Sequence, residues 1–299
     1  MKLLSIGDEV GHGTYERHAS FRRAASFRQG DSLVFLVSEE IGPGPLNLVV
    51  GDCGFEITQT VPSITIDNDI LTLGRYQLRF AETDRYRSGL ALGAFQNDSF
   101  ARNVSQFREF IMELAHPKSL AFLLDRARLN HFETGFERAF ARQVTSGVAQ
   151  FFRGALEEGI AALKGCGVGL TPSGDDFIAG ILIGLNLLQK QQGRDFRPTL
   201  DNICEAAKGS NLLSNTFLEM AKRGRGFEAM KNLITSLHQD SEAAVQTCTR
   251  KLLTFGGTSG SDLATGFLMT LEDDTDVIAR LNAPWVSQDT THALEVGVE

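Results

Sequence analysis

The chain has 299 residues, enough for one large domain or two ordinary ones and ample to bury a core. With 42% hydrophobic and 22% charged residues, it has the composition of a soluble globular protein. The formal net charge of −8 argues against nonspecific binding to nucleic acid, so small molecules or proteins are the expected partners.

The start of the chain and its cysteines predict a cytoplasmic protein. The apolar run after Lys2 ends already at Gly7, which is too short for a signal peptide. The six histidines have no metal-binding spacing, so none is assigned to a metal. The cysteines are far apart and form no CxxC pair, which fits reduced thiols better than disulfides or a zinc site. They are Cys53, Cys166, Cys204 and Cys248.

Short β-prone runs broken by Gly, Pro, Asn and Asp fill residues 31–81 and predict an antiparallel β module. The runs are Ser32–Glu39, Leu46–Asp52, Phe55–Val61, Ser63–Asp67, Ile70–Leu73 and Tyr76–Phe80. The two prolines of Gly42–Pro45 lack the N–H groups that a ladder needs, so we expect a stiff turn there.

A basic cluster precedes these runs and allows two interpretations. It consists of Arg17, Arg22, Arg23 and Arg28, interleaved with Phe21 and Phe27. One interpretation is a solvated face beside two core phenylalanines. The other is a clamp for a carboxylate or phosphate, because guanidinium groups bind those anions through two parallel hydrogen bonds.

Helical periodicity replaces the strand pattern from about Ser99 onward. Three apolar stripes are expected to lie in the core: Phe107, Phe110, Ile111 and Leu114; Leu120, Leu123 and Leu124; and Phe132, Phe136 and Phe140. Further helices are predicted at Val144–Leu163, Asp176–Gln189, Leu200–Lys208, Asn211–Lys222, Phe227–Leu237, Glu242–Leu253, Asp262–Leu271 and Asp274–Leu281. The pattern predicts an α+β protein, with a β-rich module at 1–95 and a helical domain at 96–299.

The segment Gly165–Leu188 organises the helical domain. Three alternating glycines (Gly165, Gly167, Gly169) allow positive φ, and Ser173 with Asp176 is spaced like an N-cap and its N3 partner. The residues that follow are apolar or glycine almost throughout. This predicts a glycine loop that enters a buried helix too short to be a good membrane span.

A second copy of this helix entry lies downstream. Ser173–Leu182 and Ser259–Leu268 share the form S-G-x-D-[FL]-x-x-G-x-L, and the second copy follows Gly256 and Gly257. If the two loops meet, their helix N-termini would suit a phosphate or carboxylate. The alternative is two ordinary helix caps, each contributing about 1 kcal/mol of stability.

Asp175 and Asp176 would compete with an anion at the helix N-terminus, so charge balance would then call for a cation. One aspartate would then stabilise the helix. The other would face the site as a Mg²⁺ ligand through water or as an acceptor for an amide-bearing substrate. No cofactor is otherwise indicated.

Two weaker candidates accompany the loops. Cys166 between glycines could be a nucleophile, but no histidine is nearby in sequence, which favours a small-residue role in a tight loop. The polar residues from Ser210 to Thr216 are most simply another helix cap, with lining of the site as the alternative.

Three patches together resemble the AllH family. They are Gly42–Gly44, Gly167–Asp176 and Gly256–Asp262, which follow one another along the chain in the family's order and at similar separations. The resemblance implies a subunit of a complex with FdrA-like and AllG-like partners. Such a complex moves a carbamoyl group between oxalurate and phosphate in purine (allantoin) breakdown, giving carbamoyl phosphate and oxamate. The family often has histidine where this chain has Gly257, so no proton-transfer role is carried over to that position.

Two functional hypotheses follow. In the first, the chain is a catalytic subunit in which Asp175 and Asp176 act in catalysis. Its substrate-binding residues would be Gly167, Gly169, Thr171, Ser173, Gly174, Thr258, Ser259, Gly260 and Asp262. In the second, the loops of a noncatalytic subunit bind a partner chain or a regulatory metabolite.

Overall fold

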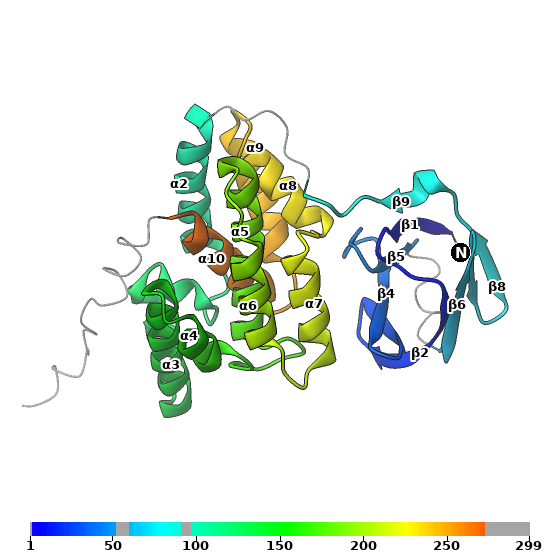
Figure 1. Ribbon diagram of the computed structural model, residues 1–299, viewed down its shortest axis with the longest axis horizontal. Helices are drawn as coiled ribbons and strands as arrows, with labels where there is room; N and C mark the ends of the chain where they lie inside the picture. Colours follow the sequence, from blue (N-terminus) through cyan, green and yellow to red (C-terminus); the bar gives the residue numbers. More distant parts are fainter. Residues whose placement is uncertain (1, 52–59, 91–96, 273–299) are drawn as a thin grey trace, which may run out of the picture.

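The computed structural model describes residues 2–51, 60–90 and 97–272. Figure 1 shows a curled β-sheet formed by the N-terminal part and a group of helices formed by the rest. The α+β class predicted from the sequence is therefore confirmed. The last strand ends at Tyr86 and the first long helix begins at Asn97, and the boundary at 95/96 between two domains stays a prediction.

The sheet contains nine strands in the order β8-β7-β6-β2-β3-β4-β5-β1-β9. The strands are β1 Leu3–Gly7, β2 Gly13–Ser20, β3 Ala24–Gln29, β4 Ser32–Ser38, β5 Asn47–Val50, β6 Ser63–Asp67, β7 Ile70–Leu73, β8 Tyr76–Arg79 and β9 Arg85–Tyr86. The predicted runs that became β4 to β8 are confirmed. Phe55–Val61 lies outside the described residues except for Thr60 and Val61, which are not in a strand.

The prediction of an antiparallel module is wrong at one pair within residues 31–81, and a second parallel pair lies outside that range. Strand β4 runs parallel to β5, and β1 runs parallel to β9. The Gly42–Pro45 segment therefore joins two parallel neighbours and is not a hairpin turn. Its carbonyl groups hold other parts of the chain instead, because Pro45 O accepts from Glu9 N at 3.0 Å and Pro43 O accepts from Glu228 N at 2.9 Å.

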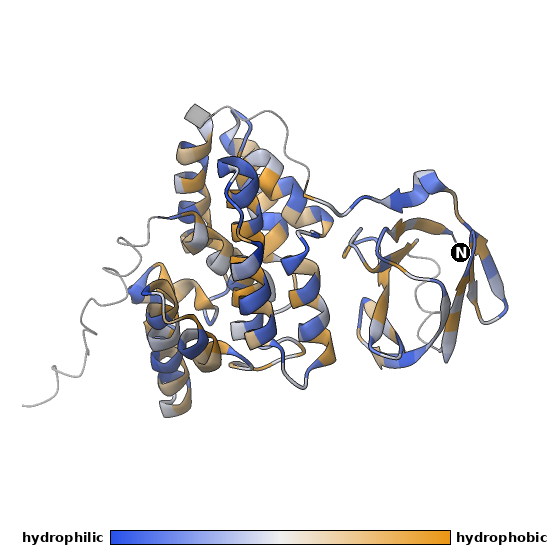
Figure 2. Ribbon diagram, in the orientation of Figure 1, coloured by the Kyte–Doolittle hydropathy of each residue, from blue (hydrophilic) through white to orange (hydrophobic). Residues whose placement is uncertain are grey.

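Strands β1, β2, β3 and β9 were not predicted. Strand β2 reads GTYERHAS, so its inward positions carry few large apolar side chains and it lacks a clear period-two pattern. The segment forms a strand because it pairs with β3 and β6 in the sheet, which the local sequence does not show. The confirmed strands β6 and β7 do alternate between buried and more exposed residues. Figure 2 shows that hydrophobic and hydrophilic residues are interspersed along the strands of the sheet.

The helical region follows the predicted pattern closely. Its helices are α2 Asn97–Leu114, α3 Gly135–Phe152, α4 Leu156–Leu163, α5 Ser173–Gln192, α6 Arg197–Ala207, α7 Leu212–Lys222, α8 Glu228–Ser236, α9 Glu242–Leu253 and α10 Ser259–Leu271, with short 3₁₀ segments η2 Glu82–Asp84, η3 Leu120–Leu123 and η4 Arg126–His131. Among the described residues, no helix is long and apolar enough to span a membrane. The helix predicted at Asp274–Leu281 lies outside the described residues.

Two helix predictions need correction. The single helix expected at Val144–Leu163 is split into α3 and α4, because Gly154 takes φ +90° between them. The third apolar stripe is also wrong: α3 begins only at Gly135, where Thr134 and Glu137 form a capping box. Phe132 therefore lies before the helix and is buried, whereas Phe136 is 76% exposed.

Helices α5 and α10 pack against each other through glycines. A Cβ on Gly180 would lie 2.1 Å from Leu263 O, and a Cβ on Gly266 would lie 2.1 Å from Phe177 O. Such distances are far below van der Waals contact, so the two helix backbones touch. The closely packed pair explains why α5 is buried along most of its length, as predicted.

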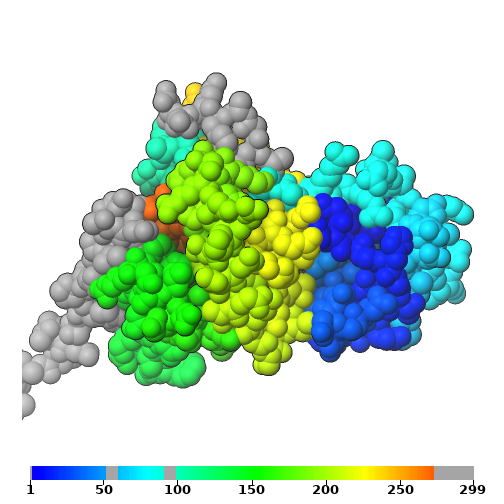
Figure 3. Space-filling model, in the orientation of Figure 1, coloured from blue at the N-terminus to red at the C-terminus, as the bar shows by residue number. Residues whose placement is uncertain are grey.

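The sheet and the helices are joined by an apolar and an ionic contact, and Figure 3 shows the yellow helical segment in contact with the blue N-terminal strands. Leu212, Leu213 and Met220 of α7 pack on a cluster from β4 and β5. Arg223 and Arg225 bind Glu9 at 2.7 and 2.9 Å. These contacts fix the sheet to both ends of α7 and to the segment that follows it.

Replacing Gly180 or Gly266 by alanine should destabilise the protein, because the added methyl group forces the two helix backbones apart. We expect a loss of about 1–3 kcal/mol in the free energy of unfolding, measured by urea denaturation. Gly135→Ala is the matched control, since its Cβ would meet nothing within 4 Å. Equal stability of all three variants would contradict the close packing.

The exposure of Phe136 makes a second prediction. Phe136→Ala should change the free energy of unfolding by less than about 0.5 kcal/mol, as is usual for surface substitutions. Phe132→Ala should cost about 3–5 kcal/mol, because Phe132 is buried between Phe122 and Phe140. Similar losses for the two variants would indicate that Phe136 is buried like Phe132, as the apolar stripe in the sequence predicted.

Candidate functional site

The two glycine loops meet in space, a question that the repeated sequence had left open. Thr171 Oγ1 lies 3.3 Å from Ser259 Oγ, and Ser173 Oγ lies 3.4 Å from Thr258 Oγ1. Each hydroxyl pair joins the first loop to the second. The loops are brought together by the glycine contacts between α5 and α10 one to two turns further along.

The preceding helices repeat as well, which sequence comparison of the two motifs did not reveal. Gly174 N donates to Cys166 O at 2.9 Å, and Gly260 N donates to Phe255 O at 3.0 Å. A Cβ on Gly174 would collide with Leu163 O at 1.9 Å, and one on Gly260 with Leu252 O at 2.2 Å. Each unit is therefore a helix end, a glycine loop and a buried helix, and the two units are related by an approximate two-fold axis.

Neither helix start is an ordinary cap, so the predicted capping box of Ser173 and Asp176 is wrong. Helix α5 begins one residue earlier than that box requires, with Pro172 as N-cap, and no side chain caps it. Thr258 is the N-cap of α10 and its side chain caps nothing either. Ser173 instead faces Thr258, which removes the simplest structural explanation for the repeated serines.

Free backbone amides extend along the loops, because several of the amides at the helix N-termini already have acceptors. The amides of Gly174, Asp175 and Asp176 already donate to Cys166 O or Pro172 O. Among the described residues, the amides of residues 167–170 and 256–258 donate no hydrogen bond. Gly165, Gly167 and Gly169 take φ of +70°, +118° and +119°, so the loop uses the conformational freedom that the sequence predicted.

Polarity changes with depth in this region. The glycines of both loops are exposed, the hydroxyl groups of Thr171, Thr258 and Ser259 are half-buried, and Ser173 is buried. Beneath them lie three aspartates, Asp175, Asp176 and Asp262, with exposures of 6%, 8% and 0%. A donor-rich surface therefore covers a layer of hydroxyl groups and a floor of carboxyl groups.

The three aspartates have different partners. Asp175 Oδ1 accepts from Gly165 N at 2.8 Å and so holds the start of the first loop. Asp176 Oδ2 accepts from the Thr171 hydroxyl at 2.9 Å. Asp262, the equivalent of Asp176 in the second unit, accepts from Leu120 N at 2.7 Å through Oδ1. Asp176 and Asp262 therefore face the loop junction, whereas Asp175 serves loop structure.

Burial raises the pKa of Asp176 to about 7, against the opposing effect of hydrogen bonds from Ser259 and Thr171. The nearby carboxylates of Asp262 and Asp175 raise it further. Burial also raises the pKa of Asp262 to about 7, although its contacts with Leu120, Thr258 and Ser173 favour the charged form. Both carboxyl groups thus titrate close to neutral pH when nothing else is bound.

One contributing segment carried no signal in the sequence. The backbone amides of His116 and Leu120 donate to Ser261 Oγ and Asp262 Oδ1. Backbone donors are independent of residue type, so no motif could have identified them. The polar cluster at α7 is a cap as predicted, since Asn211 Oδ1 accepts from Leu213 N and Ser214 N; its Nδ2 also donates to Leu170 O at 2.8 Å.

The other candidates lie apart from the junction or have local partners. Arg23 pairs with Glu40, Arg28 pairs with Asp31, and Arg17 lies over the ring of the buried Phe27. These contacts favour the interpretation as a solvated face beside the core. Cys166 is half-buried, and burial raises the pKa of its thiol, which disfavours a nucleophilic thiolate.

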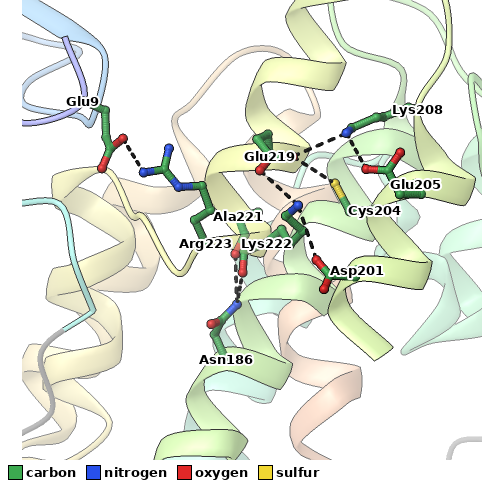
Figure 4. A network of polar contacts seen from close by, with 10 residues as sticks. All are labelled: Glu9, Asn186, Asp201, Cys204, Glu205, Lys208, Glu219, Ala221, Lys222 and Arg223. Carbon is green, nitrogen blue, oxygen red and sulfur yellow. Dashed lines mark hydrogen bonds and ion pairs between the residues drawn. The ribbon is translucent and has the colours of Figure 1, made fainter. Parts of the chain in front are cut away.

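A second polar cluster joins α6 to α7 (Figure 4). Cys204, Glu205 and Glu219 present ligand atoms within 4.8 Å of one another. Their charges are already balanced, because Lys208 lies 2.6 Å from Glu205 and Lys222 lies 3.1 Å from Glu219. This network is an ion-pair bridge between two helices.

Comparison with known proteins finds a matching family model. Residues 163–271 match the family model described as oxamate carbamoyltransferase subunit AllH. The matched span runs from the last residue of α4 to the last residue of α10 and contains both loops. No curated protein and no solved structure matches the chain.

The Gly42–Gly44 patch lies outside the matched span, so its part in the resemblance stays a prediction. Both glycine loops and all three aspartates lie inside it. The comparison therefore supports the resemblance to the AllH family of oxamate carbamoyltransferase subunits over residues 163–271.

Proposed function

We propose that this chain is a subunit of an oxamate carbamoyltransferase complex and that the loop junction is its substrate site. The reaction would transfer a carbamoyl group between oxalurate and phosphate in allantoin breakdown, with FdrA-like and AllG-like subunits as partners. The observation that carries the proposal is the meeting of the two loops within the matched span, at hydroxyl separations of 3.3 and 3.4 Å.

The free amides support the choice of ligand. Phosphate, carbamoyl phosphate, oxamate and oxalurate are all anions, and consecutive unpaired N–H groups form a concave site for an anion. Residues 167–170 and 256–258 supply such groups from two sides. Positioning and charge stabilisation account for carbamoyl transfer without a covalent nucleophile, in keeping with the raised pKa of Cys166.

The hydroxyl layer would orient the substrate. Thr171, Ser173, Thr258 and Ser259 can each donate or accept, so they suit the mixed amide and carboxylate ends of oxamate. Asp176 would act at the reacting end, while Asp175 holds Gly165 and shapes the first loop. This division follows the expectation that one aspartate is structural and the other faces the site.

A noncatalytic role is the second candidate, and one observation favours it. Val168 and Leu170, at the tip of the first loop, are 81% and 56% exposed. Two large apolar side chains on an exposed loop are typical of a contact with another protein. In this alternative the tip docks a partner subunit, which completes a site located elsewhere in the complex.

A charge placed at the loop tip should separate anion binding from docking. Val168→Asp should weaken binding of phosphate or carbamoyl phosphate to the isolated chain by about tenfold, because a carboxylate near the free amides repels an anion. Calorimetric titration of the two ligands would measure the change. The effect should shrink as salt is added.

Val168→Asn is the matched control, since it removes the apolar side chain without adding charge. It should bind anions like the original chain. If Val168→Asp and Val168→Asn bind phosphate equally well, the loop amides are not the anion site. If Val168→Asn binds normally but no longer assembles with its partners, the docking role of the tip is supported.

Loss of the cross-loop hydroxyl contact should reduce turnover. We expect Ser173→Ala to lower carbamoyl transfer by the co-expressed complex at least tenfold per folded molecule, because the hydroxyl layer loses its link between Ser173 and Thr258. The stability cost should be only about 0.5–1.5 kcal/mol. Asp176→Asn should lower turnover as well.

The control is Ser105→Ala on α2, whose hydroxyl bonds only its own helix at Ala101 O. It should keep full turnover. Normal activity of both Ser173→Ala and Asp176→Asn complexes would exclude a catalytic role for the junction and leave the noncatalytic alternative.

A further inference from the structure

The aspartates beneath the loops have no cationic partner. Asp175, Asp176 and Asp262 are all at least nine-tenths buried, and none of them forms an ion pair with any described residue. The charged groups that act on Asp176 are both negative, namely Asp262 and Asp175. Buried charges are normally paired, protonated or bound to a metal ion, because burial without compensation is costly.

The rest of the helical region follows that rule. Glu219 of the α6–α7 network lies 3.1 Å from Lys222 and 3.5 Å from Lys208 (Figure 4). Arg108 pairs with Glu272 at the end of α10. Glu219 and Glu272 are only partly buried and have cationic partners, whereas the more deeply buried aspartates of the loop junction have none among the described residues.

Asp262 supplies an independent sign of a missing ligand. Its side chain is completely buried, and its Oδ2 has no hydrogen-bond partner among the described residues. The carboxyl group faces the hydroxyls of Ser173 and Thr258, which favour its charged form without bonding Oδ2. A buried carboxylate oxygen without a hydrogen-bond partner calls for an explanation, and a bound ion that contacts this oxygen is one.

The surrounding atoms suit a hard cation. All side-chain donors at the junction are oxygens, from two carboxyl groups and four hydroxyl groups. Neighbouring oxygens lie 2.9 Å apart at Thr171 and Asp176 and 3.3 Å apart at Thr171 and Ser259. Adjacent ligands of an octahedral Mg²⁺ are about 3 Å apart, since each lies 2.0–2.1 Å from the metal. Nitrogen and sulfur donors, which zinc prefers, are absent from this described set.

We propose that the loop junction binds one divalent cation of the Mg²⁺ class between Asp176 and Asp262. The hydroxyls of Thr171, Ser173, Thr258 and Ser259 complete the oxygen shell. The ion enters from the side of the exposed glycines. Asp175 is left out of the shell, because its hydrogen bond goes to Gly165 N at the start of the loop and not to the hydroxyl layer. This site does not depend on the proposed carbamoyl transfer, since binding is measured without substrate.

The test uses the full chain, freed of metal by chelation, and Mn²⁺ as the probe. Electron paramagnetic resonance of free Mn²⁺ should show one bound ion per chain, displaced by Mg²⁺. Asp262→Asn and Asp176→Asn should each weaken Mn²⁺ binding at least tenfold, because each removes one of the two charged ligands. In metal-free buffer these variants should melt at or above the temperature of the original chain, since a neutral amide replaces an unpaired buried charge.

Glu219→Gln is the matched control, because it removes a carboxylate from the other cluster with metal-ligand spacing. It should bind Mn²⁺ like the original chain. The proposal is overturned if Mn²⁺ does not bind, or if Glu219→Gln loses binding while Asp262→Asn keeps it. Melting of the Asn variants well below the original chain without metal would also overturn it, because the aspartates would then be stabilised by the protein alone.

Discussion

The reciprocal contact between α5 and α10 is the constraint on which the site depends. Gly180 touches the carbonyl of Leu263, and Gly266 touches the carbonyl of Phe177. In each motif the touched carbonyl belongs to the residue three positions before its own glycine, so the two contacts are equivalent under a two-fold rotation. Two helices that cross this closely must bring the loops at their N-termini together, whatever residues those loops contain.

Close crossing also explains why polar groups are buried there. The aspartates lie in the first turn of each helix, on the side that meets the other helix, so contact of the backbones removes them from water. Asp176 and Asp262 then face one another's hydroxyl groups, and burial raises the pKa of both. The packing that buries the apolar residues of α5 therefore also buries the carboxyl groups at the start of the helix. Burying their negative charge is unfavourable, so a bound ligand or a proton has to offset it.

Sequence predicted most of this arrangement but not its local chemistry. The shared motif around Ser173 and Ser259 identified two equivalent helix entries, because serine, aspartate and glycine have identical spacing in both, but it left open whether the loops meet. It was not sufficient to identify the caps, since Pro172 moved the start of α5 and turned Ser173 toward Thr258. Strand β2 and the exposed Phe136 were missed for a related reason: pairing partners and an upstream cap, not periodicity, decided both outcomes.

The three-residue difference between the loops gives the two halves of the junction unequal parts. From Cys166 to Ser173 the first loop has six intervening residues, whereas the second has three between Phe255 and Ser259. The longer loop exposes Val168 and Leu170 and is anchored by Asn211, so it combines free amides with an apolar tip. The shorter loop offers only amides and Thr258. Two-fold packing thus places Asp176 and Asp262 at equivalent positions beneath the loops, and the three additional residues of the first loop make the surface above them asymmetric.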